Sequence, residues 1–184
     1  MRALVRSLVA ALGIALFPAL VFSLPSASAL AQADQGQEQV KQISLTDAQI
    51  TQFIAAQKDM NAIFAKIPQG TEKPDPKIMA QLEATAKKYK FASFEDYNDV
   101  AANIGLVMAG IDPQTKKYVG AETVLKQQIA AVQADKQMPA NERKQALDQL
   151  NEALKAVVPV QYQENIALVQ KYYAKLAALM PQQD

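Results

Sequence analysis

The spacing of apolar residues is the feature that most constrains the fold of this chain. From Leu45 onward they recur at steps of three and four, as in the run Ile50, Phe53 and Ile54. Such steps place side chains on one face of an α-helix, whereas a period of two would indicate a strand. The brief alternation at residues 158–162 contains a proline, which is disfavoured inside a sheet. The sequence therefore predicts an all-α fold.

The first helix has a well-defined start. Thr46 and Gln49 have the spacing of a capping box, and Leu45 and Ile50 have the spacing of the hydrophobic staple that accompanies it. Further along, the connection between the fourth and fifth periodic segments is short. We therefore expect one domain of five or six amphipathic helices, with a helical hairpin in the C-terminal half.

The other boundaries depend on single residues. Asp75 followed by Pro76, and later Ser93, are typical of helix N-termini. Gly110 predicts a C-terminal stop, and Pro139 predicts a helix that it begins at the first helical position. The expected helices cover residues 46–67, 75–89, 93–109, 121–135, 139–158 and 163–180, with Pro159 ending the fifth.

The N-terminal residues have the layout of a secretory signal peptide. Arg2 and Arg6 form a short positive region, and the apolar run at residues 8–21 is shorter than a comfortable membrane span of roughly 20 residues. Small residues predict cleavage after Ala29 or Ala33. We expect a signal peptide over 1–33, a disordered lead-in over 34–43 and a helical domain over 44–184. The mature protein would be periplasmic or secreted, without stable membrane insertion.

The composition argues against most catalytic chemistry. The chain has 0 His and 0 Cys, so it lacks an imidazole base, a thiolate nucleophile and the soft ligands of zinc sites. A glycan-cleaving enzyme would need two carboxyl groups facing each other across a cleft, and the pattern places the acids on outward helix faces. We therefore expect no enzymatic activity, no cofactor and no metal site.

The charge balance argues against a nucleic-acid partner. Removing Arg2 and Arg6 with the signal peptide leaves 17 of the 19 Lys and Arg residues, against 18 Asp and Glu. A near-neutral protein gains little from counterion release on a polyanion. Arg143 would be the remaining arginine, so bidentate recognition of phosphates or bases has almost no donors.

Two groups of apolar residues are candidates for a binding surface. The first helix carries one stripe, and aromatic residues gather where the second helix meets the third. The aromatic corner would suit a pocket for a small apolar ligand, or it would form ordinary core at an interhelical turn. The candidate binding residues are Ile50, Phe53, Ile54, Tyr89, Phe91, Phe94 and Tyr97.

Two sets of polar residues have helical spacing. Glu95, Asp99 and Asn103 lie four residues apart, and their oxygen atoms would suit a hard cation. Three weak ligands on one helix do not close a coordination sphere, so we favour a solvated acidic face. A second set is typical of a solvent face with weak ion pairs and consists of Lys144, Asp148, Glu152 and Lys155.

The segment Leu45-Thr46-Asp47-Ala48-Gln49 matches an L-T-x-x-Q signature and thereby resembles the Spy/CpxP family of periplasmic envelope-stress proteins. The resemblance implies a small, exported helical protein without an enzymatic site. It also implies a helical dimer whose cradle holds client proteins, as in Spy-like members. It covers this segment and the helix that follows, and the place of the family's second motif, residues 138–142, departs from it. The capping box and the staple explain the same letters.

Together these observations predict an exported, non-enzymatic helical protein whose function is to bind other molecules. The most specific version of this prediction is a chaperone-like or envelope-stress role. Its partners would be protein clients or one protein partner. A homodimer would fit an exposed, self-complementary apolar surface. The alternative is a periplasmic carrier or scaffold that holds a small apolar ligand near Tyr89 to Tyr97, or a single protein partner.

Overall fold

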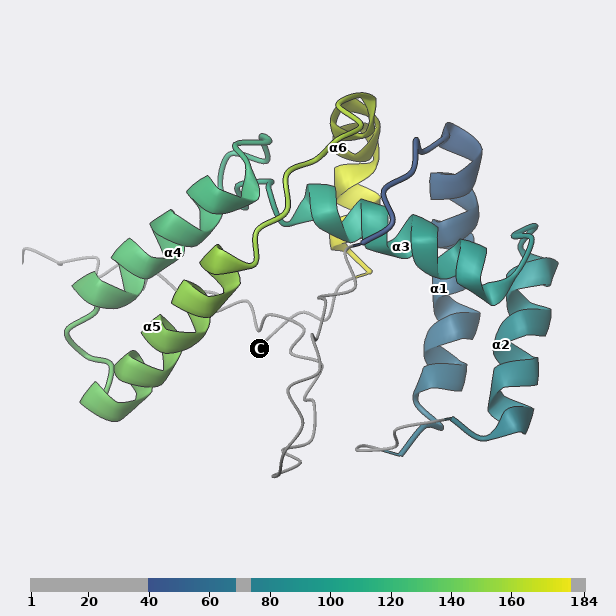
Figure 1. The fold of residues 1–184 in the computed structure, drawn as a ribbon, viewed down its shortest axis with the longest axis horizontal. Coiled ribbons are helices and arrows are strands. Elements are labelled where there is room, and N and C mark those ends of the chain that lie inside the picture. The colour runs from purple at the N-terminus through teal and green to yellow at the C-terminus, as the bar shows by residue number, and fades with distance from the viewer. Residues whose placement is uncertain (1–39, 69–73, 180–184) are drawn as a thin grey trace, which may run out of the picture.

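The computed structural model describes residues 40–68 and 74–179. In these ranges the chain forms six α-helices and no strand, and one isolated antiparallel bridge joins Ile111 to Tyr118. The helices are α1 (Asp47–Phe64), α2 (Pro76–Lys88), α3 (Phe94–Met108), α4 (Ala121–Ala134), α5 (Ala140–Lys155) and α6 (Glu164–Ala177) (Figure 1). The all-α prediction is confirmed. The expected signal peptide, residues 34–39 of the lead-in and Met180 lie outside the described residues.

Four helices build the core. α1 and α2 stand side by side, α3 crosses them, and α6 packs on α3 and α1 (Figure 1). Each of these helices contributes a side chain that is at most 1% exposed, among them Ile50, Leu82, Val100 and Val169. Full burial of one such side chain contributes about 1.5–3 kcal/mol, so this cluster holds the four helices together.

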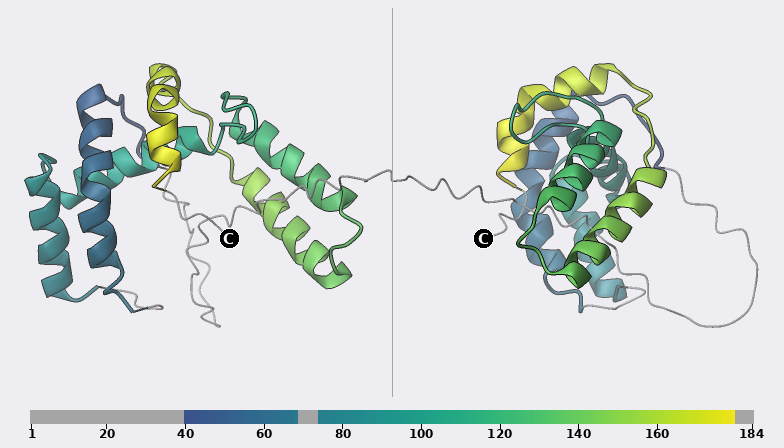
Figure 2. Two further views of the ribbon diagram at one scale, coloured as in Figure 1. Left: turned by 180° about the vertical axis from the view of Figure 1, so that it is seen from behind. Right: turned by 90° about the vertical axis from the view of Figure 1, so that its left-hand side faces the viewer.

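The remaining two helices, α4 and α5, pack on each other as a hairpin that projects away from the core (Figure 2). Val124 and Val132 of α4 are buried within the hairpin, whereas α5 has no buried residue. The hairpin predicted from the short connection is thus confirmed. Of the helices that the structure describes, none combines the length and apolarity needed to span a membrane.

The helix starts follow local sequence chemistry closely. Thr46 caps α1: its Oγ1 accepts the N–H of Gln49 at 3.2 Å, and Oε1 of Gln49 accepts the N–H of Thr46 at 2.9 Å. This pair is the predicted capping box, and the staple residues Leu45 and Ile50 are 5% and 0% exposed. α2 and α3 also begin after their expected capping residues.

Several helix ends differ from the expectation. α1 ends at Phe64 instead of continuing to residue 67. α5 begins after Pro139, which is its N-cap, and ends at Lys155, well before Pro159. The proline thus lies in the connection instead of terminating the helix. Helices fray at their last turn, and apolar periodicity alone extends past the point where the backbone turns away.

Gly110 follows the cap residue of α3 as expected, but not because its backbone is left-handed. Its φ is not positive, unlike that of Gly120 at 89°. The need for glycine is steric, because the ring of Tyr118 packs against its backbone. The bridge between Ile111 and Tyr118 holds the ring in this place.

α2 ends in a left-handed residue that is not glycine. Lys90 has a φ of 69°, and its N–H donates to the carbonyl of Lys87 at 3.0 Å. The N–H of Phe91 donates to the carbonyl of Ala86 at 3.0 Å. These two bonds define a Schellman motif, whose left-handed position glycine usually occupies. The buried Phe91 provides the apolar contact that accompanies such an end.

Residues 41–45 form an extended segment that leads into α1. Its backbone bonds to the side chains of two buried asparagines, Asn103 of α3 and Asn165 of α6. The disordered lead-in was expected to reach residue 43, but the segment from Lys41 onward is held in place. Sequence pattern could not reveal this, because the partners lie about 60 and 120 residues away.

Candidate binding surfaces

Tyr97 is the centre of an aromatic cluster on the inner side of α3. Its ring stacks on Phe53 at 5.5 Å between centroids and on Phe94 at 6.0 Å, and it meets Phe91 edge-on at 5.4 Å. The side chain is 3% exposed, and its hydroxyl accepts a hydrogen bond from Nε2 of Gln57 at 2.8 Å. Burial raises the pKa of the Tyr97 hydroxyl, because the charged form would lose its solvation. The cluster is a packed element of the core.

The residues predicted as a binding surface come together, but mainly as core. Those that are at most 3% exposed are Ile50, Phe91 and Tyr97. Those that are partly buried and pack against them are Phe53, Ile54, Tyr89 and Phe94. Phe91, Phe94 and Tyr97 do not line either of the two hollows described next, although Tyr89 lines the first.

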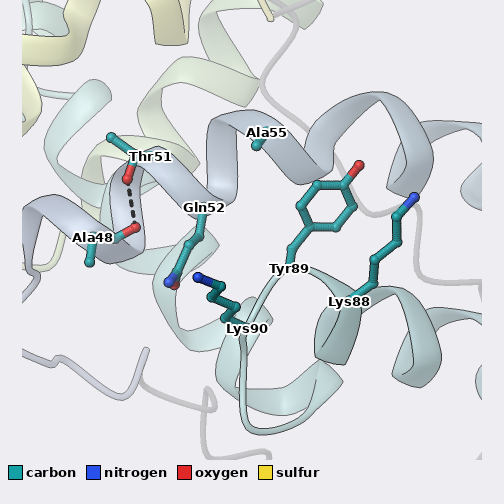
Figure 3. Close-up of a pocket in the computed structure, with 7 residues that line it drawn as sticks. All are labelled: Ala48, Thr51, Gln52, Ala55, Lys88, Tyr89 and Lys90. Carbon is teal, nitrogen blue, oxygen red and sulfur yellow. Dashed lines mark hydrogen bonds between the residues drawn. The ribbon is translucent and has the colours of Figure 1, made fainter.

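The first hollow, of about 310 Å³, lies between α1 and the C-terminal end of α2 (Figure 3). Thr51 lines it from α1, and Lys88 and Tyr89 line it from the other side. The Lys88 ammonium pairs with Asp59 at 2.7 Å, and the Tyr89 hydroxyl donates to the same carboxylate at 2.9 Å. These contacts lower the pKa of Asp59 and raise the pKa of Lys88. The polar ends of Lys88 and Tyr89 are thus already paired with Asp59 and are not free to orient a ligand in this hollow.

The second hollow, of about 280 Å³, lies where the hairpin joins the core. Leu106, Tyr118 and Glu122 line it together with residues 157–160. Ligand pockets usually enclose about 300–1,000 Å³, so this one is at the lower limit. Its mostly apolar lining suits a small apolar group or one side chain of a partner.

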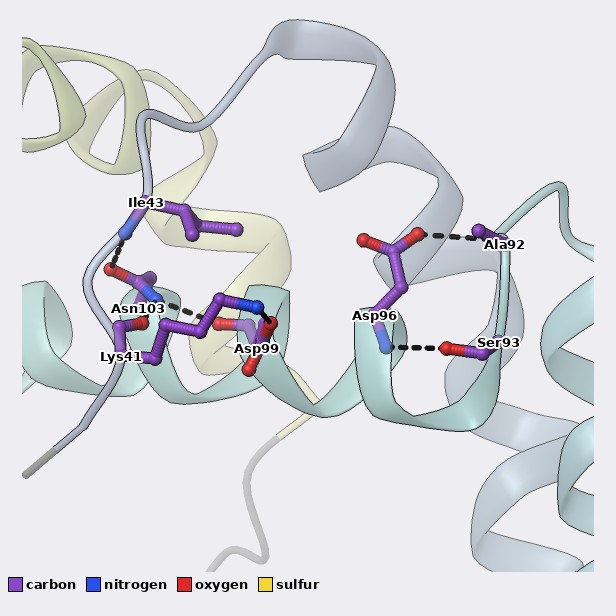
Figure 4. A network of polar contacts seen from close by, with 7 residues as sticks. All are labelled: Lys41, Ile43, Ala92, Ser93, Asp96, Asp99 and Asn103. Atoms are coloured by element: carbon purple, nitrogen blue, oxygen red, sulfur yellow. Dashed lines mark hydrogen bonds and ion pairs between the residues drawn. The ribbon is translucent and has the colours of Figure 1, made fainter. Parts of the chain in front are cut away.

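The acidic face of α3 is only partly a solvated face. Glu95 is exposed, and Asp99 pairs with Lys41 at 2.6 Å (Figure 4). Asn103 was expected on the same face but is 1% exposed, because the extended segment lies over it. Within residues 40–68 and 74–179, no group of three or more His, Cys, Asp or Glu side chains is placed to hold a metal ion.

Apart from the buried Val124 and Val132, the large apolar side chains between the two helices of the hairpin are half-buried. Two helices alone form a single layer, so residues between α4 and α5 keep part of their surface in water. We call these residues the hairpin seam: Leu125, Ile129, Leu147, Leu150, Leu154 and Val157. Apolar periodicity shows which face of each helix is apolar, but it does not show that α4 and α5 pack on each other away from the four-helix core.

Charges flank the hairpin seam in balanced pairs. On α5, Lys144 pairs with Asp148 at 2.7 Å and Lys155 pairs with Glu152 at 2.8 Å, all with exposed side chains. This is the solvent-facing ladder expected from the sequence, and exposed pairs of this kind add little to stability. Residues 121–156 contain five acidic and five basic side chains, so the hairpin has no net charge. It therefore does not favour a positively charged partner over a negatively charged one.

Comparison with models of protein families, with curated proteins and with solved structures yields no match to this chain. The function is therefore argued from the geometry of these surfaces.

Proposed function

We propose that this chain is an exported, non-enzymatic helical protein that binds other polypeptides through the hairpin seam. The most specific version of this proposal is a chaperone-like or envelope-stress role. One observation carries the proposal: the leucines of α5 at 147, 150 and 154 are only partly buried, and none of the 16 residues of this helix is fully buried. Removing apolar surface from water contributes about 25 cal/mol of free energy per Å². A complex in which a partner covers the remaining exposed area of the hairpin seam is therefore stabilised.

The shape of the hairpin seam favours a polypeptide over a small molecule. A 16-residue helix is about 24 Å long, which matches a segment of chain better than a compact ligand. The balanced charges place no strong demand on the charge of the partner. A second copy carries the same balanced pattern, so pairing of two hairpins into a homodimer is one form of this binding. The resemblance of residues 45–49 to the Spy/CpxP signature points in the same direction.

Site-specific photo-crosslinking in the cell tests the surface. A photoreactive residue at exposed Asn151 of α5, one turn from Leu147 on the same side of the helix, flanks the hairpin seam, and the same residue at exposed Gln81 of α2 is the matched control. We expect adducts from position 151 and few from position 81. Many unrelated partners would indicate client holding, and one stoichiometric partner would indicate a specific module. Equal yields at the two positions, or none at 151, would refute the assignment of the surface.

An aggregation assay tests the activity in isolation. The mature protein is mixed with an unfolding client, and light scattering is followed. Changing Leu147 and Leu150 to Ser should weaken the suppression, whereas Met79→Ser should not, although Met79 is 39% exposed on α2. Circular dichroism checks that the helices remain. If a small apolar dye binds stoichiometrically while scattering is unaffected, the carrier alternative is correct, with the second hollow as its first candidate site.

A further inference from the structure

The extended segment 41–45 is held as a bound peptide would be. Asn103 accepts the N–H of Ile43 at 3.0 Å and donates to the carbonyl of Lys41 at 2.9 Å (Figure 4). Asn165 accepts the N–H of Leu45 at 2.8 Å and donates to the carbonyl of Ile43 at 2.8 Å. We call these two residues the asparagine clamp. Each amide binds one donor and one acceptor of the backbone, as a neighbouring strand would.

The asparagine clamp has the properties of a preformed binding site for a polypeptide backbone. Asn103 and Asn165 are 1% and 2% exposed, so their amides would be costly to leave without partners. They project from different helices, α3 and α6, and both are directed at the same stretch of backbone. All four clamp bonds go to main-chain atoms, which any extended polypeptide presents.

Side chains at alternate positions of the segment add a pattern. Leu45 is 5% exposed within the core, and Ile43 packs against it. Lys41 pairs with Asp99, and Glu95 and Asp96 add to the field that raises the pKa of Lys41. The site therefore favours a basic residue at the position of Lys41 and apolar residues at the positions of Ile43 and Leu45.

We propose that the asparagine clamp is a binding site for extended polypeptide with the pattern basic–x–apolar–x–apolar, and that residues 41–45 fill it as a displaceable segment. The segment lies outside the helices, and its departure would release the Leu45 staple but leave the capping box of α1 in place. This site is separate from the hairpin seam, and it deepens the proposed polypeptide-binding function by naming a class of partner. Crosslinking at Asn151 and occupancy of the clamp report on different surfaces, so either proposal can fail alone.

The first test is peptide binding to a chain whose own segment is weakened. A tethered segment competes at an effective concentration on the order of millimolar, so the wild-type mature chain should bind free peptide poorly. The variant Ile43→Pro loses the N–H that Asn103 accepts but keeps both asparagines. It should bind the fluorescent peptide Val-Lys-Gln-Ile-Ser-Leu-Thr, residues 40–46, in a saturable manner by anisotropy.

Three controls make this test specific. Adding Asn165→Ala to the Ile43→Pro chain removes two clamp bonds and should weaken peptide binding by about 10-fold or more. A peptide with Pro in place of Ile43, or with Glu in place of Lys41, should bind less well. No saturable binding to a folded Ile43→Pro chain, or binding unchanged by Asn165→Ala, overturns the proposal.

Hydrogen exchange on the unmodified mature chain provides a second test, which does not depend on any variant folding. If the segment is displaceable, the Leu45 amide should exchange through local opening, at least about 10-fold faster than the slowest amides of α3, such as that of buried Val107. Millimolar peptide should accelerate it further. If Leu45 exchanges as slowly as Val107, the segment leaves only on global unfolding and the site is purely structural.

Discussion

The ring of Tyr118 occupies the space in which a side chain on Gly110 would begin: a Cβ there would lie 2.4 Å from Cε2 of the ring. Gly105, one and a half turns earlier, has open space at the same position. A side chain can therefore be added at Gly105 but not at Gly110 without a shift of the neighbouring atoms.

We expect Gly110→Ala to destabilise the protein by about 1–3 kcal/mol, because the ring or the backbone must move. Gly105→Ala, at an exposed position of α3, should stabilise it by about 0.5–1 kcal/mol, because alanine loses less backbone entropy on folding. Urea unfolding of both variants measures the two free energies. Equal effects would show that the contact with Tyr118 does not hold in solution.

Removing one arm of the asparagine clamp should be costly even if no foreign peptide ever binds. Asn165→Ala leaves the N–H of Leu45 and the carbonyl of Ile43 without their partners at a buried site, which costs about 1–3 kcal/mol for each group. Asn151→Ala is the matched control, because Asn151 also bonds a backbone carbonyl but is exposed on α5. That change should stay within about 0.5 kcal/mol in urea unfolding. A small effect of Asn165→Ala would mean that water replaces the amide.

Lys90 offers a stabilising change at the end of α2. A left-handed conformation costs a non-glycine residue about 1–2 kcal/mol, whereas glycine loses about 0.5–1 kcal/mol of backbone entropy. Lys90→Gly should therefore raise the free energy of unfolding by about 0.5–1 kcal/mol. Lys58→Gly in the exposed middle of α1 should lower it by about 1 kcal/mol. Thermal and urea unfolding should both separate these variants, and a loss at Lys90→Gly would show that its side chain makes an uncounted contact.

Stability should fall in acid and stay level near neutrality. Lys171 and Tyr172 lower the pKa of Asp47, and the N–H of Phe94 followed by Lys87 lowers the pKa of Glu83. A carboxyl group whose pKa is lowered on folding stabilises the folded state above its unfolded pKa, and this contribution is lost as the pH falls through the folded pKa.

We therefore expect the free energy of unfolding to decrease from about pH 4.5 downward. With 0 His and 0 Cys, it should change little between about pH 6 and 8.5. Urea midpoints measured across this range check both statements. Glu83→Gln should make the acid limb shallower, and a slope near pH 7 would contradict the expected titration.

Sequence reasoning succeeded where the chemistry is local. Thr46 and Gln49 bond to each other, so their spacing alone predicted the start of α1. It failed for Asn103, because helical spacing relates that residue to its neighbours on α3 and not to Ile43. It also could not foresee that the hairpin seam stays half-buried, since periodicity tells which face is apolar but not what covers it. The end of α3 at Gly110 was predicted correctly, but glycine is needed there for a different reason. The ring of Tyr118, brought close by the bridge to Ile111, leaves no room for a side chain.

The asparagine clamp also bears on the order in which the chain can fold. Leu45 is bonded by Asn165, 120 residues later, so the start of the domain lacks one arm of the asparagine clamp until α6 is available. Contacts between such distant parts of a sequence slow folding, because a long loop must close before they contribute. If the chain is exported as proposed, this dependence would keep its leading part loose and threadable while the C-terminal helix is still on the near side of the membrane.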